Sequence, residues 1–152
     1  MSIIMKKPLE ELKSVLSQNQ DKRITVVGTT CVGKTSLLKE IPEGIEISKL
    51  APPLTEEEKD FYYNAPLTRE NEERRLDLRA RRAFVKPGQP AFGTAIAQDT
   101  ELIVYLTISD ELLRKRTSAR RVDFEMAKTM QKFIEEWIKE SGLPVIKVQV
   151  TE

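Results

Sequence analysis

Five short stretches rich in apolar or β-branched residues predict the strands of a sheet. Residues 102–108 are apolar almost throughout, which is typical of a central strand buried on both faces. Residues 145–150 end in an alternation of apolar and polar positions, as in an edge strand. Residues 24–27 and 44–48 are two further strands, and 83–85 is a short candidate for the third strand along the chain.

Between these strands, apolar positions recur three and four residues apart, as on one face of a helix. The clearest example is 124–140, whose apolar stripe includes Met126, Met130 and Trp137. Shorter helices are predicted at 8–17, 36–41, 55–63, 68–82, 92–98 and 111–121. Helices that alternate with strands predict a three-layer α/β/α fold with a mostly parallel five-stranded sheet.

Composition limits the classes of protein that fit. With 152 residues, 39% of them hydrophobic, the chain is predicted to form one domain over 1–152, with 1–21 as an N-terminal helical extension. The net charge of +1 gives no overall attraction to nucleic acid or an anionic membrane. One cysteine and no histidine exclude a disulfide framework and histidine-based catalysis or metal binding. A cytoplasmic protein without a transmembrane span is expected.

The segment Gly28–Thr35 reads G-x-x-x-x-G-K-T, the Walker A pattern, and lies between a predicted strand and a predicted helix. Its glycines let the backbone wrap around phosphate, and its amide groups favour an anion. Lys34 is expected to reach the β- and γ-phosphates, and the Thr35 hydroxyl to bind Mg²⁺. We therefore predict that the three-layer fold is of the P-loop NTPase type, with ATP and Mg²⁺ as cofactors. The residues predicted to contact the nucleotide are Gly28, Thr29, Thr30, Cys31, Val32, Gly33, Lys34, Thr35 and Ser36.

Several classes of P-loop protein are excluded by missing motifs. The chain has neither the Asn-Lys-x-Asp nor the Asp-x-x-Gly pattern of GTPases, and no Leu-Ser-Gly-Gly-Gln stretch of ABC ATPases. Asp110-Glu111 follows the strand at 102–108, but Ser109 separates them from it, unlike the acidic pair of AAA-type ATPases.

The segment 99–120 resembles the nucleoside and nucleotide kinase group of P-loop proteins, which includes thymidylate and deoxynucleoside kinases. In that group an Asp-led strand ending in Tyr-Leu precedes a helix with an R-x-x-x-R pattern, here Arg116 and Arg120. The resemblance extends over 22–150 and implies transfer of the ATP γ-phosphate to a small acceptor, such as a nucleoside, nucleotide or similar metabolite. It implies that Arg116 and Arg120 are catalytic with Lys34, closing as a lid over the phosphates.

The same resemblance implies that the segment after the second strand binds the acceptor. Arg69 and Arg74 are the candidate acceptor-binding residues in this arginine-rich stretch. A solvated helix face crossed by ion pairs is the alternative interpretation. Acidic neighbours throughout the stretch argue against nucleic acid as its partner.

One departure from the kinase pattern bears on catalysis. Relatives carry an acidic residue at the end of the third strand, where the predicted strand 83–85 is followed by Lys86-Pro87. Asp77 and Glu46 are possible substitutes, so the Mg²⁺ ligand or base stays unassigned. A nucleotide-binding or regulatory module without catalysis is therefore an alternative function, with a polynucleotide 5′-kinase as a further one. The acceptor, the donor base and the oligomeric state are not specified by the sequence.

Overall fold

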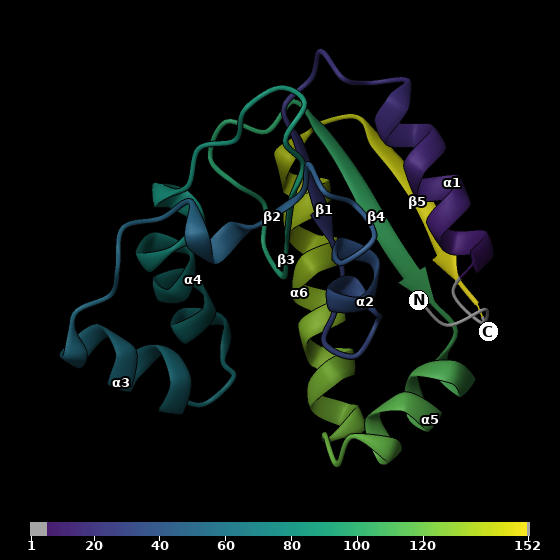
Figure 1. The fold of residues 1–152 in the computed structure, drawn as a ribbon. Helices are drawn as coiled ribbons and strands as arrows, with labels where there is room; N and C mark the ends of the chain where they lie inside the picture. The colour runs from purple at the N-terminus through teal and green to yellow at the C-terminus, as the bar shows by residue number, and fades with distance from the viewer. Residues whose placement is uncertain (1–5, 152) are drawn as a thin grey trace.

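The computed structural model describes residues 6–151, which form a five-stranded sheet in the order β2-β3-β1-β4-β5 (Figure 1). Every pair of neighbouring strands is parallel, which confirms the α/β fold and makes the sheet parallel throughout. The strands are β1 (Ile24–Val27), β2 (Ile45–Glu46), β3 (Ala91–Gly93), β4 (Leu102–Ile108) and β5 (Val145–Val150).

Helices cover both faces of the sheet, as in a three-layer fold. Helix α6 packs on one face, and α1 and α2 lie on the other (Figure 1). None of the helices within residues 6–151 is long and apolar enough to cross a membrane. The helices are α1 (Lys6–Ser17), α2 (Lys34–Leu38), α3 (Glu56–Asn64), α4 (Arg69–Leu78), α5 (Asp110–Ala119) and α6 (Phe124–Ser141), with 3₁₀ turns η2 (Ile47–Lys49) and η3 (Ala80–Arg82).

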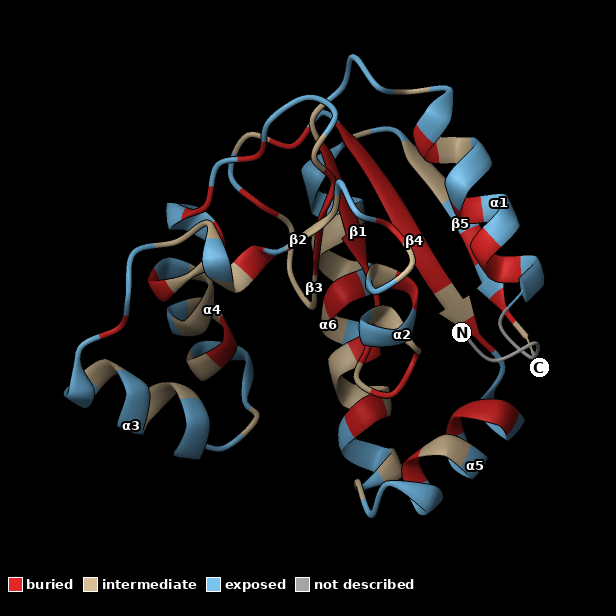
Figure 2. Cartoon of the chain, viewed as in Figure 1, coloured by how far each residue is buried: buried red, intermediate tan, exposed pale blue. Residues whose placement is uncertain are grey.

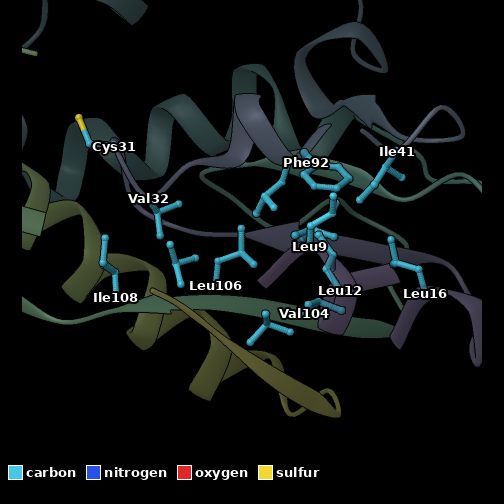
Figure 3. Packing of buried hydrophobic residues seen from close by; sticks show 14 of the residues in the cluster. Leu9, Leu12, Leu16, Cys31, Val32, Ile41, Phe92, Val104, Leu106 and Ile108 are labelled. Carbon is cyan, nitrogen blue, oxygen red and sulfur yellow. The ribbon is translucent and has the colours of Figure 1, made fainter. Parts of the chain in front are cut away.

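The main core lies between α1 and the sheet (Figure 3). Leu9, Leu12 and Leu16 share one face of α1 and are buried, as the sequence predicts. They belong to the same apolar cluster as Val104 and Leu106 of β4. The single-domain prediction stays a prediction, and the first five residues of the predicted extension lie outside the described residues.

Strand β4 lies inside the sheet between β1 and β5, and β5 forms one edge of the sheet. Six of the seven residues of β4 are buried, as its continuous apolar sequence predicts (Figure 2). In β5, Val148 and Val150 are buried while Gln149 between them is exposed, which confirms the alternating edge strand.

The predicted third strand is wrong. Residues 83–85 form no strand: Phe84 is 61% exposed, and the Val85 amide donates to Asp99 Oδ1 at 2.8 Å instead of to a neighbouring strand. The third strand is β3, bonded to β1 and β2 on its two sides. Its pairing depends on close approach, because a Cβ added to Gly93 would lie 2.4 Å from the Ile47 side chain. The brief helix expected at 92–98 is also wrong, since it overlaps β3.

Other boundaries differ by a few residues. Thr55 and Glu58 form the predicted capping box at the start of α3. The predicted helix 68–82 breaks at Arg79, which separates α4 from η3. Strand β2 is shorter than 44–48, because its residues from Ile47 onward turn into η2.

Candidate functional site

The Walker A segment connects β1 to α2 at the carboxyl end of the central strand. Gly33 has φ 110° and Cys31 has φ 66°, so two residues of the loop are left-handed. Gly28 has no room for a side chain: an added Cβ would lie 2.8 Å from Val32 Cγ1 and 3.2 Å from Leu106 Cβ. The loop is therefore tightly curved and lies directly on β4.

Lys34 turns back onto the loop that precedes it. Its Nζ donates to the carbonyl oxygen of Thr29 at 2.8 Å and to that of Gly28. Burial of the amine lowers the pKa of Lys34 from its ordinary 10.5 to about 7, the nearby Cys31 opposes this effect, and the positive charge of Arg120 adds to it. A phosphate group beside Nζ would reverse this shift, since it favours the charged amine.

Thr35 and Ser36 are exposed in the first turn of α2. The part of the chain between residues 6 and 151 gathers no group of three or more Cys, Asp or Glu side chains that could hold a metal. Mg²⁺ is commonly bound by one or two protein oxygens together with phosphates and waters. The exposed Thr35 hydroxyl fits that mode, in which the nucleotide supplies most of the ligands.

The two arginines of the R-x-x-x-R pattern lie close to the loop. Arg116 of α5 donates from Nη1 to the Val32 carbonyl oxygen at 2.9 Å. Arg120 is the C-cap residue of α5, and its positive charge contributes to the lowered pKa of Lys34. Arg121 follows with φ 55°, a left-handed turn that redirects the chain toward α6. The fold thus brings together the three residues predicted to be catalytic, Lys34, Arg116 and Arg120.

No carboxylate stands at the end of the corrected third strand. Gly93 ends β3 and is followed by Thr94 and Ala95. Lys86 lies in a turn that bridges to Gln89 and is not at the end of a strand. Correcting the strand therefore moves the expected position of the acidic residue but does not supply one.

A cavity of 410 Å³ lies beside the end of β3, between α6 and the helices that follow β2. Thr94 and Ala95 form part of its wall, and the neighbouring Gly93 accepts the Gly28 amide at 3.3 Å. The cavity wall is mostly apolar and aromatic, with a few charged groups. It is lined by Ile47, Tyr62, Tyr63, Ala65, Leu67, Glu72, Arg75, Leu76, Arg79, Ala80, Thr94, Ala95, Met126, Met130 and Trp137.

Glu72 and Arg75 form an ion pair in the cavity wall. Their side chains are 5% and 13% exposed, and burial raises the pKa of Glu72 while Arg75 lowers it. Arg75 also donates to the carbonyl oxygens of Tyr62, at 2.9 Å, and Ala65. The pair therefore fixes the connection between α3 and α4 and carries the only carboxylate among the lining residues.

The predicted acceptor-binding arginines do not line this cavity. Arg69 pairs with Glu136 at 2.5 Å and Glu140 at 3.0 Å on α6. Arg74 places its guanidinium 4.1 Å from the centre of the Phe61 ring. Their role toward an acceptor stays a prediction.

Sequence reasoning missed the charged residues that do line the cavity. Glu72, Arg75 and Arg79 share a helical face with Leu76, at the spacing i, i+3, i+4 and i+7. A charged helix face is ordinarily expected to contact solvent, so the spacing alone predicts that this face lies on the surface of the protein. The one signal in the sequence was Leu76 in the middle of that face.

Comparison with known proteins supports the fold. A gluconokinase from Sinorhizobium meliloti 1021 is similar to this chain with a TM-score of 0.55 and 20% sequence identity, covering 88% of this chain and 85% of its own. The chain has a P-loop kinase fold, although this similarity does not single out thymidylate or deoxynucleoside kinases. The hydrogenase maturation factor HypB from Archaeoglobus fulgidus matches with a TM-score of 0.30 and 13% identity over 95% of this chain and 89% of its own, too low for any argument.

No protein-family model and no curated protein sequence matches the chain.

Proposed function

We propose that the protein is an ATP-dependent kinase that transfers the γ-phosphate to a small acceptor bound in the 410 Å³ cavity. The observation that carries this proposal is the juxtaposition of two sites at the carboxyl ends of neighbouring strands. The Walker A loop follows β1, and the cavity adjoins the end of β3. Ligands of open parallel sheets bind at this edge.

The roles of the loop residues follow from the charge that phosphoryl transfer must neutralise. Lys34 would leave the Thr29 carbonyl and bind the β- and γ-phosphates as an ammonium. Thr35 would hold Mg²⁺, which supplies further charge neutralisation when bound. Arg120 would close over the γ-phosphate, and Arg116 would hold the loop through Val32.

Glu72 is our candidate for the group that accepts the proton of the acceptor hydroxyl. It is the only carboxylate among the lining residues of the cavity. Its burial raises its pKa, which makes it a better base than an exposed glutamate. Glu46 and Asp77, the substitutes considered from the sequence, are both outside the cavity wall.

A nucleotide-binding module without turnover is the second candidate function. The observation that favours it is the missing carboxylate after β3. It predicts tight ATP binding with no acceptor-dependent ADP formation. A polynucleotide 5′-kinase is the weakest of the alternatives, because the arginines of α4 and η3 are paired with acidic side chains or stacked on aromatic rings.

The test is an ADP-release assay with Mg-ATP and a panel of small hydroxyl compounds. The panel contains nucleosides, nucleoside monophosphates, sugars and gluconate, the last because of the structural relative. We expect acceptor-dependent ADP formation that Lys34→Ala lowers by at least about 10²-fold. Lys39→Ala, an exposed lysine five residues on, is the matched control. ATP binding without turnover on the whole panel would favour the second candidate.

A further inference from the structure

One residue of the Walker A loop, Thr29, is hydrogen-bonded to α6, the helix that forms one side of the cavity. Thr29 is 1% exposed, and its Oγ1 donates to the carbonyl oxygen of Ala127 in α6 at 2.6 Å. Ala127 is fully buried. The bond joins residues 98 positions apart in the sequence and links the nucleotide loop directly to α6.

The neighbours of Ala127 on α6 face the cavity. Met126 precedes it and Met130 follows three residues later, and both line the cavity wall. Since an α-helix moves largely as a rigid rod over one turn, a displacement of Ala127 also displaces these two methionines. The same turn of α6 therefore contacts the loop on one side and the cavity on the other.

Thr29 also contacts the residue expected to change most when nucleotide binds. Lys34 Nζ donates to the Thr29 carbonyl oxygen at 2.8 Å. Phosphates that draw the ammonium away would leave this carbonyl with the Val32 amide at 3.3 Å as its remaining donor, and a weakly paired buried carbonyl is costly. The Thr29 peptide is then expected to reorient, while its hydroxyl keeps hold of α6.

We infer that Thr29 is a positioning residue that transmits nucleotide binding to the acceptor cavity through its hydrogen bond to Ala127. Nucleotide bound in the loop shifts the first turns of α6 and so moves the Met126 and Met130 side chains in the cavity wall. The inference rests on the proposed binding of nucleotide by the loop. It predicts a coupling between the two sites that does not depend on which acceptor is used.

The methionines provide a direct readout. The chain has four, two of which are Met126 and Met130. ¹³C-methyl methionine spectra recorded with and without Mg-ADP report the environment of these side chains, with Met126→Leu and Met130→Leu used for assignment. We expect Mg-ADP to shift both signals in the wild-type protein.

Two variants of Thr29 separate coupling from a merely structural bond. Thr29→Val removes the hydroxyl at nearly constant volume, and we expect it to reduce the ADP-induced shifts by about half or more. Its ADP affinity, measured by calorimetry, should fall by no more than about tenfold, as for the loss of one neutral hydrogen bond. Thr29→Ser keeps the hydroxyl and should restore the shifts.

Thr129→Val is the matched control. The Thr129 hydroxyl also donates to an α6 carbonyl, that of Glu125 at 2.9 Å, but has no bond to the loop. It should leave the ADP-induced shifts as in the wild type.

Three results would overturn the inference. The first is a wild-type spectrum in which bound ADP shifts neither methionine signal. This result needs no variant, so it would overturn the inference even if Thr29→Val failed to fold. Unchanged shifts in a folded Thr29→Val protein would show that the coupling does not pass through this hydroxyl. Failure of the wild type to bind ADP by calorimetry would overturn the proposed function, and the inference with it.

Discussion

The Walker A loop and the helical lobe that walls the cavity (α3, α4 and η3, residues 56–82) are held in place by different forces. Val32 and Leu37, on either side of Lys34, are fully buried in the main core. Helix α3 buries no residue, and α4 buries only Glu72 and Leu78 (Figure 2). Apolar burial thus positions the loop, while the lobe has little apolar surface in its helices to contribute.

Arginines supply much of the internal structure of the lobe. Arg79 stacks on Tyr62, with its guanidinium 4.2 Å from the ring centre, and donates to the Tyr63 hydroxyl at 2.7 Å. Arg75 reaches back to carbonyl oxygens of the α3–α4 connection. Polar and cation–π contacts of this kind are individually weaker than a packed core. The comparison indicates that apolar packing holds the nucleotide loop, whereas polar and cation–π contacts hold much of the lobe.

The largest expected effect comes from breaking the buried ion pair of the lobe. Arg75→Met leaves the Glu72 carboxylate buried without its partner, which should cost about 3–5 kcal/mol of lobe stability. The measurement is amide hydrogen exchange in α4, where protection should fall much more than in β4. A uniform loss of protection in both elements would contradict the separation of the two regions.

Two control variants sharpen this result. Arg81→Met removes an exposed arginine that pairs with Glu73 and Asp77, and should cost less than about 1 kcal/mol. The double variant Arg75→Met/Glu72→Gln removes both charges and should recover part of the lost protection, because no charge is then left buried.

The difference between the two regions also explains what the sequence could predict. The loop is defined by eight consecutive residues between a strand and a helix, so its position followed from local pattern. The strand at 102–108, the edge strand at 145–150 and the long helix ending near 140 were equally clear, because their burial patterns are strong.

The cavity side was not predictable in the same way. Strand β3 has three residues, none β-branched, and exists because β1 and β2 bond to it on both sides. Arg69 and Arg74 could not be told from Arg75 and Arg79 by composition, since only the packing of α4 decides which face turns inward. That packing depends on contacts between residues far apart in the sequence.

The next largest effect tests the role proposed for Arg120 beside the loop. Arg120→Ala should lower turnover by about 10²-fold, as for loss of one group that stabilises charge in the transition state. Affinity for ADP should change much less, because ADP lacks the γ-phosphate. Comparing kcat with the calorimetric ADP affinity checks this split. A larger loss in ADP affinity than in kcat would assign Arg120 to ground-state binding.

A smaller effect follows from the lowered pKa of Lys34, about 7 in the free protein. Above that pH the amine is neutral, so binding of a phosphate must be accompanied by proton uptake, and ADP affinity should fall by up to about tenfold per pH unit. Calorimetry in buffers of different ionisation enthalpy should show uptake of about one proton near pH 8.5 and almost none near pH 6.

The same lowered pKa of Lys34 determines the direction in which the stability of the protein changes with pH. The unfolded chain keeps the Lys34 proton up to about its ordinary pKa of 10.5, whereas the folded protein releases it at about 7. Between these values the unfolded state binds more protons, so this residue makes stability rise with pH. Lys34→Met should reduce this rise of the free energy of unfolding with pH. Proton uptake that persists in Lys34→Met would assign the pKa to another group.

The smallest effect is expected where the lobe meets α6 at the surface. Arg69 is 55% exposed in its ion pairs with Glu136 and Glu140, so Arg69→Ala should lower stability only slightly, and the loss should vanish at high salt. Because Arg69 lies outside the cavity wall, the same variant should leave the acceptor KM unchanged. A rise in KM that survives high salt would instead support Arg69 as an acceptor-binding residue. It would also mean that Arg69 leaves its ion pairs with Glu136 and Glu140 and reaches the acceptor during turnover.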